Sequence, residues 1–137
     1  MTQDAKSYLQ QIFKLDAEVD NLEENRQAIY ASFLKAANIT DLPKVPAKGN
    51  QMEERMLKVV EISDMVNAKV DELLDLKIKI FKQIEKLDER DHRLVLEKRY
   101  IQQKSWETIC GEMAYSKSNI FRLHSEALGV FWTTMEC

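Results

Sequence analysis

The sequence predicts an all-α protein in which a long antiparallel coiled-coil helical hairpin is followed by a small helix-turn-helix domain. The 137 residues include only 3 Gly and 2 Pro, and 31% are charged, a balance typical of long helices. Apolar residues recur in heptads through the first two thirds of the chain. The last third instead carries two short helical segments joined by a tight corner. A chain of this length is too short for a large multidomain enzyme.

The first element is a helix from about residue 3 to residue 37. Its apolar positions alternate steps of four and three residues, which is the spacing of a coiled-coil seam. The seam positions are Tyr8, Ile12, Leu15, Val19, Leu22, Ile29, Phe33 and Ala36. Such a seam keeps one stripe of the helix against a partner helix over many turns.

A loop is expected from Asn38 to Asn50, because this segment holds both prolines and one glycine. Asn50, with Glu53 three residues later, is the expected N-cap of a second helix. The seam then continues through Met52, Met56, Val59, Val66, Val70, Leu73, Ile80, Ile84 and Leu87. Each helix is about 50 Å long at 1.5 Å per residue, so the two can fold back on each other as a hairpin over residues 1–87.

Further apolar residues widen the stripe beyond what one partner helix covers. They are Leu9, Phe13, Leu34, Leu57, Val60, Leu74 and Phe81. We therefore expect hairpins from two or more chains to form a homo-oligomeric bundle. A heptad seam indicates packing and not chemistry, so a plain scaffold is the alternative role of this region.

The heptads stop after Leu87, and residues 88–137 form the second predicted domain. The charged cluster at residues 88–91 favours a helix start, and a short helix is expected to about Gln102. Ser105 and Ser116 are the expected N-caps of two further helices, with Ala114 and Tyr115 at the corner between them. The faces that these helices bury against each other are formed by Ile109, Cys110, Ile120 and Leu123.

The segment from Leu87 to Phe131 resembles region 4 of the bacterial sigma-70 family. The similarity lies in residues 95–100 (VLEKRY), residues 105–109 (SWETI) and residues 116–120 (SKSNI) with Ala127-Leu128. The longer phrase from Arg99 to Leu128, behind a helical N-terminal region, is similar to the small phage and prophage regulators of the RinA and ArpU type. The resemblance implies double-stranded DNA binding and control of phage late or packaging genes, with host RNA polymerase as a candidate partner.

If the last long helix enters the major groove, its N-terminal side chains reach base edges. Asn119 can pair with adenine, Arg122 with guanine, and Phe121 can lie against a thymine methyl group. The full set of candidate DNA contacts is Lys117, Ser118, Asn119, Phe121 and Arg122, with Ser105, Lys104 and Arg99 at phosphates.

Several of these residues have a plainer interpretation. Asn119 and Arg122 can be ordinary solvated surface residues, and Trp106 a packing residue. Phe121 lies off the apolar face of its helix, so it is either exposed for a partner or DNA, or covered by the hairpin. His124 either touches phosphate or is a partly buried structural histidine.

Composition limits the other functions. The formal net charge of −3 means that any basic DNA-binding surface must be local. The 2 Cys and 2 His form no metal-ligand or catalytic pattern, so we expect no enzyme, no metal and no cofactor. No stretch has the length of a membrane span and no signal peptide is recognisable, so a cytoplasmic protein is expected, in the host bacterium if it is phage-encoded.

The sequence thus favours a sequence-specific transcriptional regulator that acts as an oligomer. Two alternatives stay open: a DNA-packaging subunit resembling a small terminase subunit, and a coiled-coil adaptor that engages a host protein without binding DNA.

Overall fold

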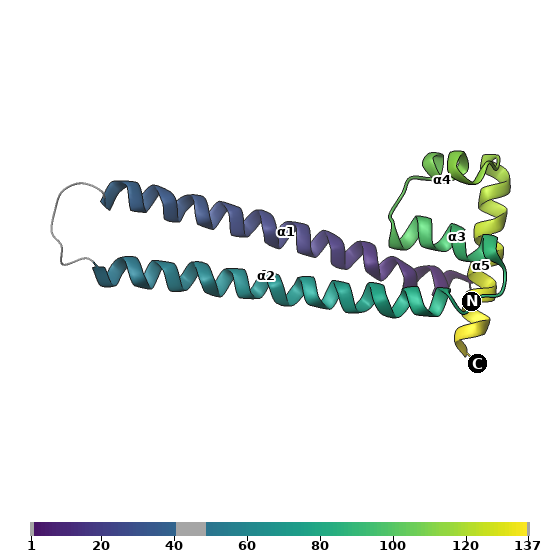
Figure 1. Ribbon diagram of the computed structural model, residues 1–137, viewed down its shortest axis with the longest axis horizontal. Coiled ribbons are helices and arrows are strands. Elements are labelled where there is room, and N and C mark those ends of the chain that lie inside the picture. The colour runs from purple at the N-terminus through teal and green to yellow at the C-terminus, as the bar shows by residue number, and fades with distance from the viewer. Residues whose placement is uncertain (1, 41–48, 137) are drawn as a thin grey trace. The chain divides into compact units, whose positions relative to one another are not determined.

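The computed structural model describes residues 2–40 and 49–136 (Figure 1). The elements are α1 (Thr2–Thr40), α2 (Gly49–Ile84), α3 (Arg90–Leu96), a π-helical turn η2 (Glu97–Ile101), α4 (Trp106–Met113) and α5 (Lys117–Glu136). These described residues contain no strand. The predicted all-α class, with long N-terminal helices followed by shorter ones, is confirmed.

Both long helices extend further into the predicted loop than expected, whereas α2 ends at Ile84, three residues before the last predicted seam position, Leu87. The predicted loop from Asn38 to Asn50 is helical at both of its ends, up to Thr40 and from Gly49, and its residues 41–48 lie outside the described residues. The N-cap prediction for Asn50 is wrong because α2 already includes Gly49. Asparagine costs a helix less than about 1 kcal/mol, so neither Asn38 nor Asn50 is enough to end one.

The chain forms two compact units. Residues 16–72 make up one, here called the hairpin unit, and residues 1–15 together with 73–137 make up the other, called the C-terminal unit. This division differs from the predicted boundary between residues 87 and 88. The start of α1 and the end of α2 belong with the C-terminal helices because their apolar side chains are buried among them.

In the hairpin unit α1 and α2 lie side by side and antiparallel (Figure 1). Leu22 shares a groove with Met65, and Ile29 shares one with Ile62. Residues later in α1 therefore lie beside residues earlier in α2, as in any antiparallel pair of helices. Val66 is buried, while the seam residues Val19, Leu22 and Val59 are half-buried. Ile29 is 41% exposed, because two helices alone cover only part of each other.

The C-terminal unit contains nearly all of the buried side chains among the described residues. Its fully buried residues come from every element: Leu9, Ile12, Ile80, Ile84, Val95, Leu96, Tyr100, Ile109, Ile120 and Phe131. The seam residues Leu15 and Leu73 are also buried in this unit. Both α3 and α4 contact α5. Tyr8 of α1 packs on Phe131 with ring centroids 6.1 Å apart and donates a 2.7 Å hydrogen bond to Gln83.

The short helix predicted after residue 87 is not one α-helix. It is α-helical from Arg90 to Leu96 and then widens into the π-turn η2, in which the amide of Gln102 donates to the carbonyl of Glu97 at 2.8 Å. Such turns are uncommon and occur frequently at functional sites. Here the wider turn carries Lys98, Arg99 and Tyr100 into the neighbourhood of α4 and α5, where their side chains make the contacts described next.

Candidate nucleic-acid interface

The corner between α4 and α5 has the predicted capping pattern. The Ser105 hydroxyl accepts a hydrogen bond from the amide of Thr108 at 3.2 Å, and the Ser116 hydroxyl accepts one from the amide of Asn119 at 3.3 Å. Ala114 ends α4 in the left-handed region, with φ 60° and ψ 41°. These contacts confirm both N-cap predictions and the corner, because each serine satisfies an amide that its helix leaves free.

The two helices bury the apolar faces that the sequence indicated, with one difference. Ile109 and Ile120 are fully buried and Leu123 is half-buried. Cys110, predicted as a core residue, is only half-buried. Tyr115 remains 37% exposed and its hydroxyl donates to a carboxylate oxygen of Asp91 at 2.5 Å, so the corner is attached to the start of α3.

The five base-contact candidates all lie exposed at the N-terminal end of α5. They are Lys117, Ser118, Asn119, Phe121 and Arg122. Arg122 donates to the side-chain oxygen of Asn119 at 3.4 Å, which holds the two groups side by side. Phe121 is 43% exposed. The structure therefore brings these residues together on one accessible stretch of helix.

Trp106 supports Phe121 from α4. The two rings meet edge to face with centroids 5.3 Å apart, and the Trp106 ring also meets His124 edge to face at 4.8 Å. Trp106 is half-buried and its ring contacts both neighbours, so it acts as a packing residue that fixes the position of an exposed phenylalanine.

Arg99 is not presented as a free phosphate ligand. Its guanidinium lies between two rings, 4.6 Å from the centroid of Trp106 and 5.6 Å from that of Phe13, and it donates a 3.0 Å hydrogen bond to the carbonyl of Lys104. Cation–π contacts of this kind stabilise a partly desolvated arginine. Sequence reasoning missed this arrangement, and the only available signal was the off-seam position of Phe13.

Lys104, the other basic phosphate candidate, is paired with Glu112. Its ammonium lies 2.9 and 2.8 Å from the two carboxylate oxygens, and Lys98 reaches Oε1 of the same carboxylate at 2.7 Å. The hydrogen bonds from Lys104 and then from Lys98 hold the pKa of Glu112 below its usual value. Glu112 therefore stays ionised and paired with both lysines.

His124 is a buried structural residue. It is 8% exposed, and its Nε2 lies 2.8 Å from the hydroxyl of Tyr100. Burial, and then the charges of Lys6 and Arg99, lower its pKa to about 4, so the imidazole is neutral near pH 7. Burial also raises the pKa of Tyr100 to about 12. The alternative in which His124 touches phosphate is thus excluded by its position.

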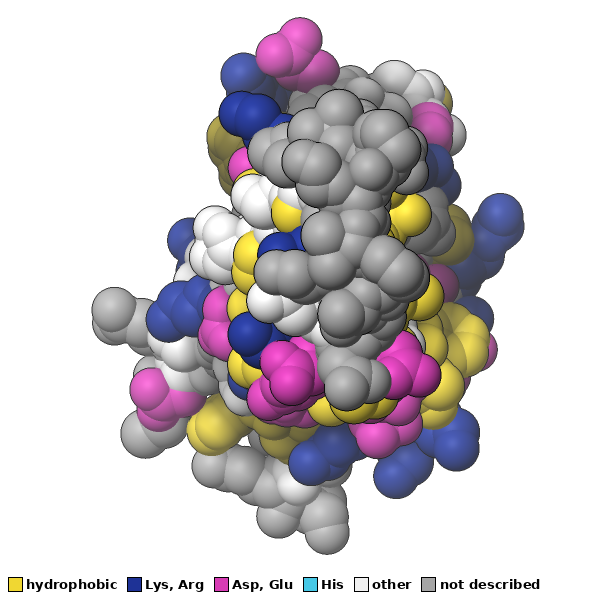
Figure 2. Space-filling model, turned by 90° about the vertical axis from the view of Figure 1, so that its left-hand side faces the viewer, with side chains coloured by type: hydrophobic (Ala, Val, Ile, Leu, Met, Phe, Trp, Pro, Cys, Tyr) yellow, Lys and Arg dark blue, Asp and Glu magenta, His cyan; other side chains and the backbone are white. Residues whose placement is uncertain are grey.

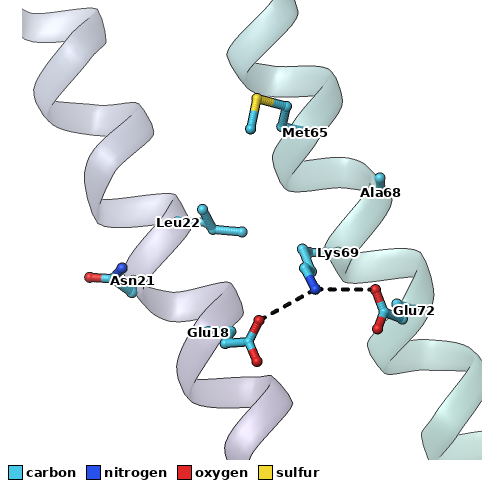
Figure 3. Close-up of a pocket in the computed structure, with 7 residues that line it drawn as sticks. All are labelled: Glu18, Asn21, Leu22, Met65, Ala68, Lys69 and Glu72. Carbon is cyan, nitrogen blue, oxygen red and sulfur yellow. Dashed lines mark ion pairs between the residues drawn. The ribbon is translucent and has the colours of Figure 1, made fainter.

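The hairpin unit contains an open groove between its helices (Figure 3). Its lining residues are Glu18, Asn21, Leu22, Met65, Ala68, Lys69 and Glu72. Lys69 bridges the groove, with its ammonium 3.4 Å from Glu18 and 3.4 Å from Glu72. The groove holds no nucleophile with an adjacent base, and its charges are paired, so it offers contact surface rather than chemistry.

The surface view in Figure 2 shows basic and acidic side chains interspersed with hydrophobic ones. Within residues 2–40 and 49–136, no group of three or more His, Cys, Asp or Glu is placed to hold a metal ion. In the same part of the chain, no helix is both long enough and apolar enough to cross a membrane.

Comparison with known proteins places the chain in a family. Residues 47–130, more than half of the chain, match the family described as "Protein of unknown function (DUF1492)". The chain therefore belongs to this family. No curated protein and no solved structure matches the chain significantly.

Proposed function

We propose that this member of the DUF1492 family is a sequence-specific DNA-binding transcriptional regulator that acts as an oligomer, of the RinA and ArpU type, on phage late or packaging genes. The observation that carries the proposal is the row of exposed polar side chains at the start of α5, directly after a capped helix-turn-helix corner. That is the place from which recognition helices contact base edges.

In this proposal the start of α5 lies in the major groove. Asn119 donates to and accepts from adenine, Arg122 donates to guanine, and the exposed ring of Phe121 contacts a thymine methyl group. Lys117 binds a backbone phosphate. The 3.4 Å hydrogen bond between Arg122 and Asn119 and the contact of Phe121 with Trp106 support this reading, because they limit the orientations of three base-reading side chains before DNA arrives.

The test is capture of fragmented phage and host DNA by the purified protein at two salt concentrations. The wild type is expected to enrich one or a few sites, and the double variant Lys117→Ala, Arg122→Ala to bind them at least about tenfold more weakly. The matched control is Lys35→Ala, Lys58→Ala, which removes the same charge from exposed positions of the hairpin unit and leaves the enrichment unchanged. No enrichment at either salt concentration, or equal loss in both double variants, contradicts specific readout by α5 and favours the adaptor.

The oligomer is proposed from the apolar surface of the hairpin unit. Large side chains that are at least 41% exposed there are Ile29, Tyr30, Leu34, Met56, Leu57, Val60 and Met65. A surface of this kind in one chain is typical of an interface. Oligomerisation also brings together two or more helix-turn-helix modules, each of which has a small contact area of its own.

A substitution in this surface is expected to separate the chains. Leu57, which is 68% exposed, becomes charged in Leu57→Glu, and sedimentation is expected to report a monomer instead of the dimer or small bundle of the wild type. The control is Lys58→Gln, which changes the charge by the same amount at the next, exposed position and retains the oligomer. A ring of many subunits favours the DNA-packaging subunit, and a monomeric wild type contradicts the proposed oligomer.

A further inference from the structure

The C-terminal unit contains a three-residue ionic cluster that the proposed DNA readout does not use. Lys98 comes from η2, Lys104 from the connection before α4, and Glu112 from the last turn of α4. One carboxylate accepts from both ammonium groups, at distances from 2.7 to 2.9 Å. The carboxylate of Glu112 thus occupies the position in which a phosphate would bind both lysines.

We infer that Glu112 is an internal competitor for DNA phosphate, which occupies Lys98 and Lys104 and so weakens the part of DNA binding that does not depend on sequence. This inference rests on the proposed function. In this role Glu112 affects specificity without contacting a base.

The cluster is accessible and easily rearranged. The Glu112 and Lys104 side chains are 36% and 32% exposed, and that of Lys98 is 18% exposed. The pair of Lys104 and Glu112, in which each side chain is about one-third exposed, stabilises a fold only weakly, so a phosphate can replace the carboxylate at Lys104 at little cost to folding. Both ion pairs still compete with phosphate, because each lysine must leave Glu112 before it binds DNA.

The basic side chains of α5 are in a different situation. Neither Lys117 nor Arg122 forms an ion pair with any other residue in the described parts of the chain, and both are exposed. Glu112 therefore reduces the contribution of two lysines outside the recognition helix and leaves the base-reading helix unaffected. Because non-specific affinity depends mainly on the number of lysine and arginine contacts to phosphate, such an arrangement raises the ratio of specific to non-specific binding.

The variant that tests this is Glu112→Gln, which keeps the shape of the side chain and removes its charge. Binding to a random-sequence duplex at low salt is expected to become about three- to tenfold tighter, and the salt dependence steeper by about one to two phosphate contacts. Affinity for the captured site is expected to rise by a smaller factor, so the ratio of specific to non-specific binding falls; an equal rise at both sites contradicts the inference.

Two comparisons make the test decisive. In the background Lys98→Gln, Lys104→Gln, the Glu112→Gln substitution is expected to have no effect, because there are no lysines to release. Glu89→Gln removes the same charge from an exposed helix cap that forms no side-chain capping bond, and is expected to change affinity less than twofold. A gain that persists without the lysines, or that Glu89→Gln reproduces, overturns the inference.

Thermal unfolding of each variant separates competition from a structural role. If Glu112→Gln lowers both the midpoint of unfolding and DNA affinity, the cluster holds η2 on α4 and the inference is wrong. If the wild type binds no duplex at all, the proposed function fails together with the inference. If the wild type enriches a site that depends on Lys117 and Arg122 while Glu112→Gln has no effect, only the inference fails.

Discussion

Replacing Phe131 with alanine is expected to destabilise the C-terminal unit by about 3–5 kcal/mol, the usual cost of removing a buried phenylalanine. Phe131 is completely buried on α5 and packs on Tyr8 of α1. The substitution therefore leaves a cavity between segments more than 120 positions apart in the chain. Since domains of this size are stable by only about 5–15 kcal/mol, the loss is a large part of the total.

Phe121 on the same helix is the matched control. It is 43% exposed, so Phe121→Ala is expected to cost less than about 1 kcal/mol while weakening the binding of DNA sites. Both tryptophans, Trp106 and Trp132, lie in the C-terminal unit, so urea unfolding followed by tryptophan fluorescence reports on this unit. A loss below about 1 kcal/mol in Phe131→Ala, no larger than that in Phe121→Ala, would contradict the predicted role of Phe131 in the core.

The sequence pattern predicted the two long helices, but it did not predict which segments cover all of their apolar faces. Heptad spacing indicates that one stripe of a helix is covered and leaves open what covers it. The predicted contacts of Leu9 and Phe13 with another chain are wrong: Leu9 is completely buried within its own chain, and Phe13 stacks on Tyr100 with ring centroids 5.5 Å apart. The other off-seam residues, Leu34, Leu57, Val60, Leu74 and Phe81, remain 42–68% exposed.

The candidate interface was predictable where the signal is local. A serine cap and its target amide lie three residues apart, so the corner and the exposed start of α5 followed from the sequence. The states of Arg99 and Lys104 depend instead on residues brought near by the fold: Phe13 is 86 positions away from Arg99. A count of charges treats every basic residue as available to bind phosphate. In the structure, however, Arg99 contacts aromatic rings and Lys104 is paired with Glu112.

The stability of the C-terminal unit is expected to depend on pH through two groups of opposite effect. The pKa of His124 falls from 6.5 to about 4 on folding. Below pH 6.5 the unfolded chain therefore binds a proton that the folded chain does not, and the free energy of unfolding decreases as the pH falls from about 6.5 to about 4. The full effect of such a shift is about 3 kcal/mol.

Glu97 acts in the other direction. Burial, and then the hydrogen bond and charge of Glu85, raise its pKa from 4.5 to about 7 against the opposing charge of Arg93. Between about pH 7 and pH 4.5 the folded chain binds a proton that the unfolded chain does not, so this group increases the free energy of unfolding as the pH falls. The two windows overlap, and the wild type is expected to show only a weak dependence between pH 7 and pH 4.5.

Glu97→Gln is expected to leave only the pH dependence of stability that His124 causes, because glutamine resembles the protonated carboxyl and does not titrate. The free energy of unfolding of this variant, measured by urea and tryptophan fluorescence, should fall by about 2–3 kcal/mol from pH 7 to pH 4.5. Adding His124→Gln, which retains a hydrogen-bonding partner for Tyr100, should make the profile flat again. A Glu97→Gln profile no steeper than that of the wild type would mean that His124 accepts its proton in the folded chain. The buried imidazole of His124 would then carry a positive charge beside Tyr100, which is the result that its burial is expected to prevent.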